Sequence, residues 1–194
     1  FTAVKCTDQV GNHDIYHSPD NFYALYLDCR ANKGDWWWGG RSAYPLNTNK
    51  INGGSPLQPT EKRVIATVKW VMEKYGIDPN RVYLAGNSMG GSGALGIGMR
   101  HGNLFAAIKV NVPAGIEHVY DRMMFSPNVS HQNHDLPEPP VVIDYSAQND
   151  RWSKGHERFV KAMNERKYPL YFYWGPFGHN NNHARILKVN DLIN

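Results

Sequence analysis

The segment best suited to carry out chemistry is Gly86-Asn-Ser-Met-Gly90, which has the pattern G-x-S-x-G. It follows an apolar run and precedes a stretch that favours a helix. A serine hydroxyl can act as a nucleophile when a sharp strand-to-helix turn exposes it above a sheet, and small neighbours let the chain pack closely there. The amide of Met89 would point into the same space, where developing negative charge is favoured. We therefore predict Ser88 as a nucleophile and Met89 as an oxyanion-hole residue. The alternative is a glycine-rich turn used only for packing.

A serine nucleophile needs a general base, and the base needs an acid to orient it. Where a serine stands at such a turn, the order along the chain is serine, acid, histidine. Asp150 lies in the loop after the next-but-one predicted strand, whereas Asp144 falls inside that strand and Asn149 carries no charge. His179 lies in the loop after the last predicted strand, and its competitor His183 falls at the start of a helix. We predict Asp150 as the acid and His179 as the base, with a surface helix cap as the alternative role for Asp150.

The residues predicted to react lie at the ends of predicted strands. The strands are predicted at Phe22–Leu27, Val82–Ala85, within Phe105–Val112, at Val141–Tyr145 and at Leu170–Trp174. Helices are predicted from Thr60, as the N-cap, to Gly76, at Gly93–Arg100, at Arg151–Arg166 and from His183 onwards. Because strands and helices alternate, we expect an α/β fold with a parallel sheet that is covered on both faces.

Composition is consistent with one globular domain over residues 1–194. Apolar residues make up 41% and charged residues 20% of the 194 residues, and this balance is typical of a folded chain. The net charge is +4, but the 21 basic residues are scattered, so we expect no nucleic-acid partner. No apolar run approaches the ~20 residues that span a bilayer. We therefore expect no membrane partner.

Metal, cofactor and disulfide chemistry receive little support from the sequence. His118, His131 and His134 match no familiar ligand spacing, so we expect no metal and no cofactor. Cys6 and Cys29 do not form a CxxC motif. A disulfide between them would suit a secreted protein, and two free thiols are the equal alternative.

Three adjacent tryptophans, Trp36, Trp37 and Trp38, stand in a long loop rich in glycine and asparagine. Their faces could line an acyl or sugar site, because aromatic rings offer large apolar contacts. Packing of the loop onto the core is the alternative. With Asn87, beside the predicted nucleophile, they form the candidate substrate-binding set.

The run from Gly76 to Gly91, GIDPNRVYLAGNSMGG, resembles secreted bacterial and fungal esterases of the polyhydroxybutyrate-depolymerase and feruloyl-esterase group. The resemblance extends from about Tyr23 to His179. It implies the α/β-hydrolase fold, with Ser88, Asp150 and His179 as a catalytic triad, no cofactor, and a secreted or extracytoplasmic location. Prolyl-oligopeptidase relatives share part of this run, but usually have tyrosine where this chain has Met89.

The chain departs from that group at its start. The group places an apolar strand ending in His-Gly before the strand that corresponds to Phe22, and the His-Gly loop supplies the second oxyanion amide. Here no His-Gly occurs in the 21 residues before Phe22. Either the oxyanion loop is rebuilt, or the chain is the C-terminal portion of a longer protein and does not contain the usual N-terminal strands of the domain.

Three hypotheses about function follow. The first is a serine carboxylic ester hydrolase that works through an acyl-enzyme on short-chain or aromatic acyl esters, either small molecules or polymer-linked. The second is a serine peptidase of the prolyl-oligopeptidase type. The third is a non-catalytic binding module with the same fold. The sequence leaves the oligomeric state open.

Overall fold

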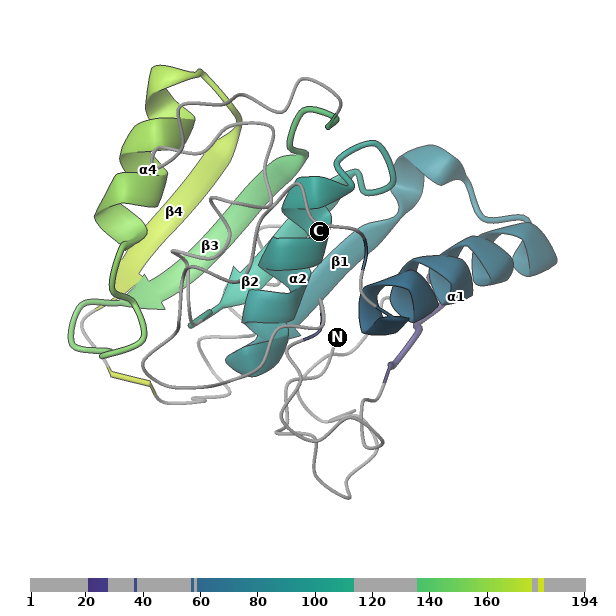
Figure 1. Ribbon diagram of the computed structural model, residues 1–194, viewed down its shortest axis with the longest axis horizontal. Helices are drawn as coiled ribbons and strands as arrows, with labels where there is room; N and C mark the ends of the chain where they lie inside the picture. Colours follow the sequence, from purple (N-terminus) through teal and green to yellow (C-terminus); the bar gives the residue numbers. More distant parts are fainter. Residues whose placement is uncertain are drawn as a thin grey trace.

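The computed structural model describes residues 21–27, 37, 57, 59–113, 136–175, 178 and 179. Its centre is a sheet of four parallel strands in the order β1-β2-β3-β4 (Figure 1). The strands are β1 (Tyr83–Asn87), β2 (Ala107–Asn111), β3 (Val141–Ala147) and β4 (Leu170–Gly175). The helices are α1 (Pro59–Tyr75), α2 (Met89–Arg100) and α4 (His156–Glu165), with a short 3-10 turn η2 (Pro79–Arg81) before β1. This arrangement is the expected α/β class.

One face of the sheet carries the main core. Leu84, Ile108 and Val142 occupy paired positions on β1, β2 and β3, and all three are buried in one cluster. Residues from α1, α2 and α4 pack into the same cluster. In Figure 1, α2 crosses over β1 and β2. The parallel strands all end at the same edge, so the loops that follow them meet there.

Helix α1 shows how local sequence sets an element's ends. The predicted apolar face is confirmed, since the buried residues of α1 include Val64, Ile65 and Val68. The prediction of Thr60 as N-cap is wrong, because the helix already includes Pro59 and Thr60 is buried inside its first turn. Proline fits the start of a helix, where its missing N–H has no partner to lose. Gly76 follows the helix with φ of 61°, the left-handed conformation that commonly ends helices.

The segment predicted as a buried strand, Phe22–Leu27, is irregular, and Leu27 is its one buried residue. Its rings pack on neighbouring elements instead. The ring centroid of Phe22 lies 5.7 Å from that of Tyr83, and the ring of Tyr23 lies 5.1 Å from that of Tyr75. The aromatic run favours a strand by propensity, but tertiary ring contacts decide its conformation, and the strand prediction is wrong.

Two helix starts differ from the prediction. Helix α2 begins at Met89, immediately after Ser88, rather than at Gly93. Glycine lowers helix propensity by about 1 kcal/mol, but here the helix needs it. A β-carbon at Gly93 would overlap the side chain of Trp37. Helix α4 begins at His156 because the residues before it form turns.

The other predictions concern the two cysteines, a C-terminal helix, membrane-spanning helices and metal ligands. Cys6, Cys29 and the helix predicted from His183 lie outside it. Among the described helices, none combines the length and apolarity that crossing a bilayer requires. The described residues also contain no group of three potential metal ligands, and His118, His131 and His134 lie outside them.

Candidate active site

Ser88 stands at a sharp turn between β1 and α2. Its φ and ψ are 54° and −120°, a combination that costs a residue with a side chain on the order of 1–3 kcal/mol. The surrounding backbone fixes this conformation, since the amide of Ser88 donates to the carbonyl of Asn111 at 2.9 Å. Strain of this kind concentrates at functional sites. The turn therefore has the geometry that the G-x-S-x-G pattern predicts.

Glycines beside the turn permit a close approach of the backbone. A β-carbon at Gly86 would overlap the carbonyl of Gly90, and one at Gly91 would lie 3.0 Å from the carbonyl oxygen of Asn111. Any larger residue at position 86 would push α2 away from β1. The pattern thus reflects a steric requirement of the turn that holds Ser88.

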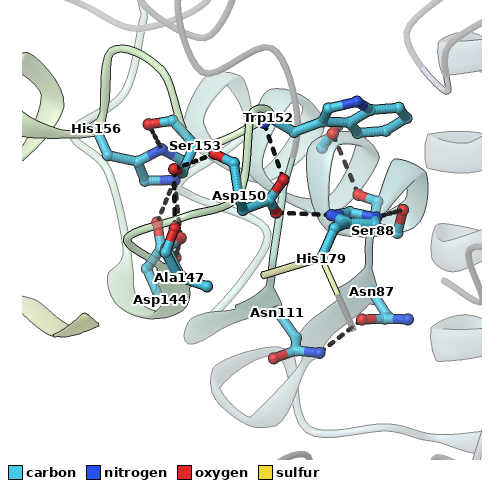
Figure 2. Close-up of polar contacts among 12 residues, drawn as sticks. Asn87, Ser88, Asn111, Asp144, Ala147, Asp150, Trp152, Ser153, His156 and His179 are labelled. Carbon is cyan, nitrogen blue, oxygen red and sulfur yellow. Dashed lines mark hydrogen bonds and ion pairs between the residues drawn. The ribbon is translucent and has the colours of Figure 1, made fainter. Parts of the chain in front are cut away.

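The structure brings Ser88, Asp150 and His179 together from three separate loops (Figure 2). The distance from Ser88 Oγ to His179 Nε2 is 2.6 Å, and that from His179 Nδ1 to Asp150 Oδ2 is 2.7 Å. Asp150 is 5% exposed, whereas His179 is exposed. A proton on Nδ1 donated to the carboxylate leaves Nε2 as an acceptor for the serine hydroxyl. The expected contacts are present, and His183 lies outside the described residues.

Trp152, which the residue pattern did not single out, supports this arrangement in two ways. Its backbone amide donates to Asp150 Oδ1 at 2.9 Å. Its ring lies against the imidazole of His179, with 4.9 Å between centroids (Figure 2). One residue therefore contacts both the acid and the base. The available signal was an aromatic residue two positions after the predicted acid, in the same loop.

The amide of Met89 is suited to bind an oxyanion. Met89 is the first residue of α2, and the first amides of a helix have no intrahelical acceptor. The helix dipole also favours negative charge at this end. A second amide donor was considered among the residues before Phe22. Of those residues, the structure describes Asn21 alone.

The family follows from comparison with known proteins. The family model named Esterase, described as "Putative esterase", matches residues 66–171, which is more than half of the sequence. The chain belongs to the esterase family. The matched region contains two of the three residues that meet at the turn, Ser88 and Asp150. No curated protein sequence matches the chain.

Solved structures show the fold of this esterase. It resembles a Bacillus cereus carboxylesterase (TM-score 0.52, 15% identity, 69% of this chain covered) and Arabidopsis thaliana SOBER1 (TM-score 0.54, 18% identity, 74% of this chain and 68% of that one). It also resembles FphF, a fluorophosphonate-binding serine hydrolase of Staphylococcus aureus (TM-score 0.52, 15% identity, 77% and 69%). The chain spans 58% of the length of the Bacillus cereus protein. These likenesses show that the esterase shares the α/β-hydrolase fold of those proteins.

Two residues of the candidate substrate-binding set lie inside the protein. Asn87 is 2% exposed and accepts a hydrogen bond from Asn111 Nδ2 at 2.6 Å, so its side chain links β1 to β2. Trp37 is 1% exposed and packs against Gly93 of α2. Burial leaves neither side chain a surface for substrate, and both are corrected to structural residues. Trp36 and Trp38 lie outside the described residues.

Replacing Trp37 by phenylalanine tests this correction. The smaller ring leaves a gap against α2, so we expect the free energy of unfolding to fall by about 1 to 3 kcal/mol. KM for an ester substrate should stay within about twofold. Denaturant unfolding and steady-state kinetics measure the two effects. A large rise in KM with unchanged stability would restore Trp37 to the substrate-binding set.

A second histidine–carboxylate pair lies beside the first. Asp144, the competing acid, faces away from His179 and lies 3.4 Å from His156 Nε2 (Figure 2). Burial lowers the pKa of His156, but the charge and hydrogen bond of Asp144 outweigh burial and raise the pKa above its ordinary value. Glu157 on α4 adds to the rise, and from β4 only the uncharged rings of Phe172 and Trp174 face the imidazole.

This raised pKa predicts a pH-dependent stability. Below the ordinary histidine value of about 6.5, His156 is protonated in both the folded and the unfolded chain, and its full stabilisation is present. As the pH rises from about 6.5 through the raised pKa, that contribution is lost. We expect the stability advantage of the wild type over His156→Gln to shrink across this window, measured by denaturant unfolding at several pH values. An advantage that grows with pH would contradict the pairing with Asp144.

Proposed function

We propose that this esterase hydrolyses carboxylic esters through an acyl-enzyme formed on Ser88. The observation that carries the proposal is the pair of hydrogen bonds from Ser88 Oγ through His179 to Asp150, at 2.6 and 2.7 Å. Near neutral pH a free serine hydroxyl is a weak nucleophile, and an adjacent oriented base activates it. The membership of the esterase family supports the ester as the substrate class.

The reaction takes place in two halves. Ser88 Oγ attacks the ester carbonyl while His179 Nε2 accepts the hydroxyl proton, and the collapse of the tetrahedral intermediate expels the alcohol with that proton. A water molecule then gives a proton to His179 and attacks the acyl carbonyl. Collapse of the second intermediate releases the carboxylic acid, and the proton on His179 returns to Ser88 Oγ.

Charge is stabilised at both ends of this proton transfer. The Asp150 carboxylate, held by the amide of Trp152, stabilises the imidazolium that forms on His179. The amide of Met89 and the N-terminus of α2 face the developing oxyanion. Removal of a single oxyanion donor in comparable hydrolases costs on the order of 10²–10³ in kcat.

The proposed substrates are short-chain or aromatic acyl esters. The contact between Ser88 and His179 is exposed, so a small ester can reach it directly. Trp37 lies in the core, and within the described part of the chain the ring of Trp152, which is only partly buried, lies beside the reacting atoms. A flat acyl group could stack there.

A substrate panel tests the proposal. It contains p-nitrophenyl esters of increasing chain length, methyl ferulate and a chromogenic peptide, compared by kcat/KM. We expect the short or aromatic esters to be hydrolysed fastest. Fastest turnover of the peptide would support the peptidase hypothesis, and fastest turnover of the longest ester would overturn the acyl preference. No turnover of any substrate would support a non-catalytic module.

A further inference from the structure

A polar cluster lies fully buried next to the loop that carries Asp150. Asp144 and Ser146 of β3 and His156 at the start of α4 are each 0% exposed. The proposed reaction uses none of them. Because buried polar groups are costly unless they are satisfied, the cluster needs a structural or functional explanation.

The hydrogen bonds of the cluster determine where its protons lie. His156 Nδ1 is 2.7 Å from the carbonyl oxygen of Ser153, which can only accept, so Nδ1 carries a proton. The hydroxyl of Ser146 donates its one proton to Asp144 Oδ1 at 2.7 Å. Nε2 of His156, 2.9 Å from Ser146 Oγ and 3.4 Å from Asp144 Oδ2, must therefore donate as well. The ring is then an imidazolium: Nε2 donates to Ser146 Oγ, and the positive charge faces Asp144 Oδ2, a buried oxygen with no hydrogen bond of its own.

Contacts through Ser153 connect this ion pair to Asp150. His156 Nδ1 donates to the carbonyl of Ser153, and the Ser153 hydroxyl lies 2.6 Å from the carbonyl oxygen of Asp150 and 2.9 Å from that of Ala147. The amide of Ser153 also donates to the Asp150 carbonyl at 3.0 Å. The loop between β3 and α4 is thus held on the side of Asp150 that lies opposite His179 (Figure 2).

We propose that His156, as an imidazolium paired with Asp144, is a positioning residue that holds the loop so that the Asp150 carboxylate meets His179. Its effect on turnover rests on the proposed function, whereas its effect on the contact between Asp150 and His179 does not. A displacement of about 1 Å at a reacting group can lower a rate about 10²-fold, so a loop residue that orients the base needs a rigid support.

The test compares His156→Gln with a matched control, His101→Gln. His101 Nε2 lies 2.9 Å from the buried carboxylate of Glu61, and this pair joins α1 to the end of α2, away from the Asp150 loop. Both substitutions break a histidine–carboxylate contact inside the protein. The readouts are kcat and KM for p-nitrophenyl acetate, Tm, and the low-field proton NMR resonance of the hydrogen shared by His179 and Asp150.

For His156→Gln we expect kcat to fall about 10- to 100-fold, KM to stay within about twofold, and the low-field resonance to broaden or disappear. For His101→Gln we expect a lower Tm with kcat and the resonance unchanged. A folded His156→Gln protein with wild-type kcat and resonance would overturn the inference. So would an equal loss in the control, because the effect would then be general destabilisation.

Breaking a buried ion pair is strongly destabilising, so Ser153→Ala provides a second test that leaves the pair intact. It removes the hydroxyl next to the Asp150 carbonyl, and we expect a smaller loss of kcat and a weaker resonance, with recovery in Ser153→Thr. Unchanged kcat and resonance in Ser153→Ala would overturn the connection between His156 and Asp150. If the wild type hydrolysed no ester but showed the low-field resonance, and His156→Gln lost that resonance, the proposed function would fail while the positioning role would stand.

Discussion

Replacing Ser88 by alanine is expected to lower kcat for ester hydrolysis by about 10⁴- to 10⁶-fold and to leave the fold intact. The loss follows from the 2.6 Å contact between Ser88 Oγ and His179, because no other atom in that contact can form the acyl-enzyme. The fold should persist because alanine adopts the strained φ of 54° at the same cost as serine. Initial rates on p-nitrophenyl acetate and Tm measure both outcomes.

Ser92→Ala is the matched control for that experiment. Ser92 lies one helical turn beyond Ser88, and its hydroxyl donates to the Ser88 carbonyl at 3.2 Å. The proposed proton transfer does not use this hydroxyl, so its loss should change kcat by less than about tenfold. If Ser88→Ala kept activity within tenfold of the wild type, or if Ser92→Ala matched its loss, the assignment of the nucleophile would be wrong.

Replacing Asp150 by asparagine is expected to lower kcat by about 10⁴-fold with little change in Tm. An amide at this position can still accept the hydrogen bond from Trp152 at Oδ1, so the loop keeps its shape. It carries no charge to stabilise the imidazolium of His179, and its NH₂ group favours the wrong tautomer of the ring. The neighbouring substitution Asn149→Ala, at an exposed position, should leave kcat nearly unchanged. Retention of more than a tenth of the wild-type kcat in Asp150→Asn would contradict the role of Asp150 as the acid.

The contacts among Ser88, Asp150 and His179 could be predicted because each residue follows a strand of a parallel sheet. The carboxyl ends of such strands meet at one edge, so the order of residues along the chain is enough to bring their side chains together. The glycine pattern around Ser88 added a local steric signal. Neither inference required knowledge of how any loop folds.

The support around these residues could not be predicted, because it depends on loop conformation. Nothing in the sequence shows that the loop after β3 turns the ring of Trp152 onto His179, or that Ser153 connects His156 to the carbonyl of Asp150. The direction of the tryptophan loop was equally hidden, and Trp37 packs in the core.

The alternation of side chains along a strand could have shown that Asn87 does not belong to the substrate-binding set. Successive side chains of a strand point to opposite faces, and Leu84 of β1 lies in the main core. Asn87 is three positions further along, so it belongs to the other face, where it pairs with Asn111 of β2. Its position next to Ser88 in the sequence therefore did not mean that the two side chains share a site.

The most direct test of the central claim is the identification of the residue that a fluorophosphonate probe modifies. Probe-treated protein is digested, and the labelled peptide is sequenced by mass spectrometry. A serine with an oriented base reacts with such probes because its oxygen is activated for attack. We expect a single label on Ser88 that is absent from Ser88→Ala and strongly reduced in His179→Ala. No label, or a label on a different serine, would contradict it.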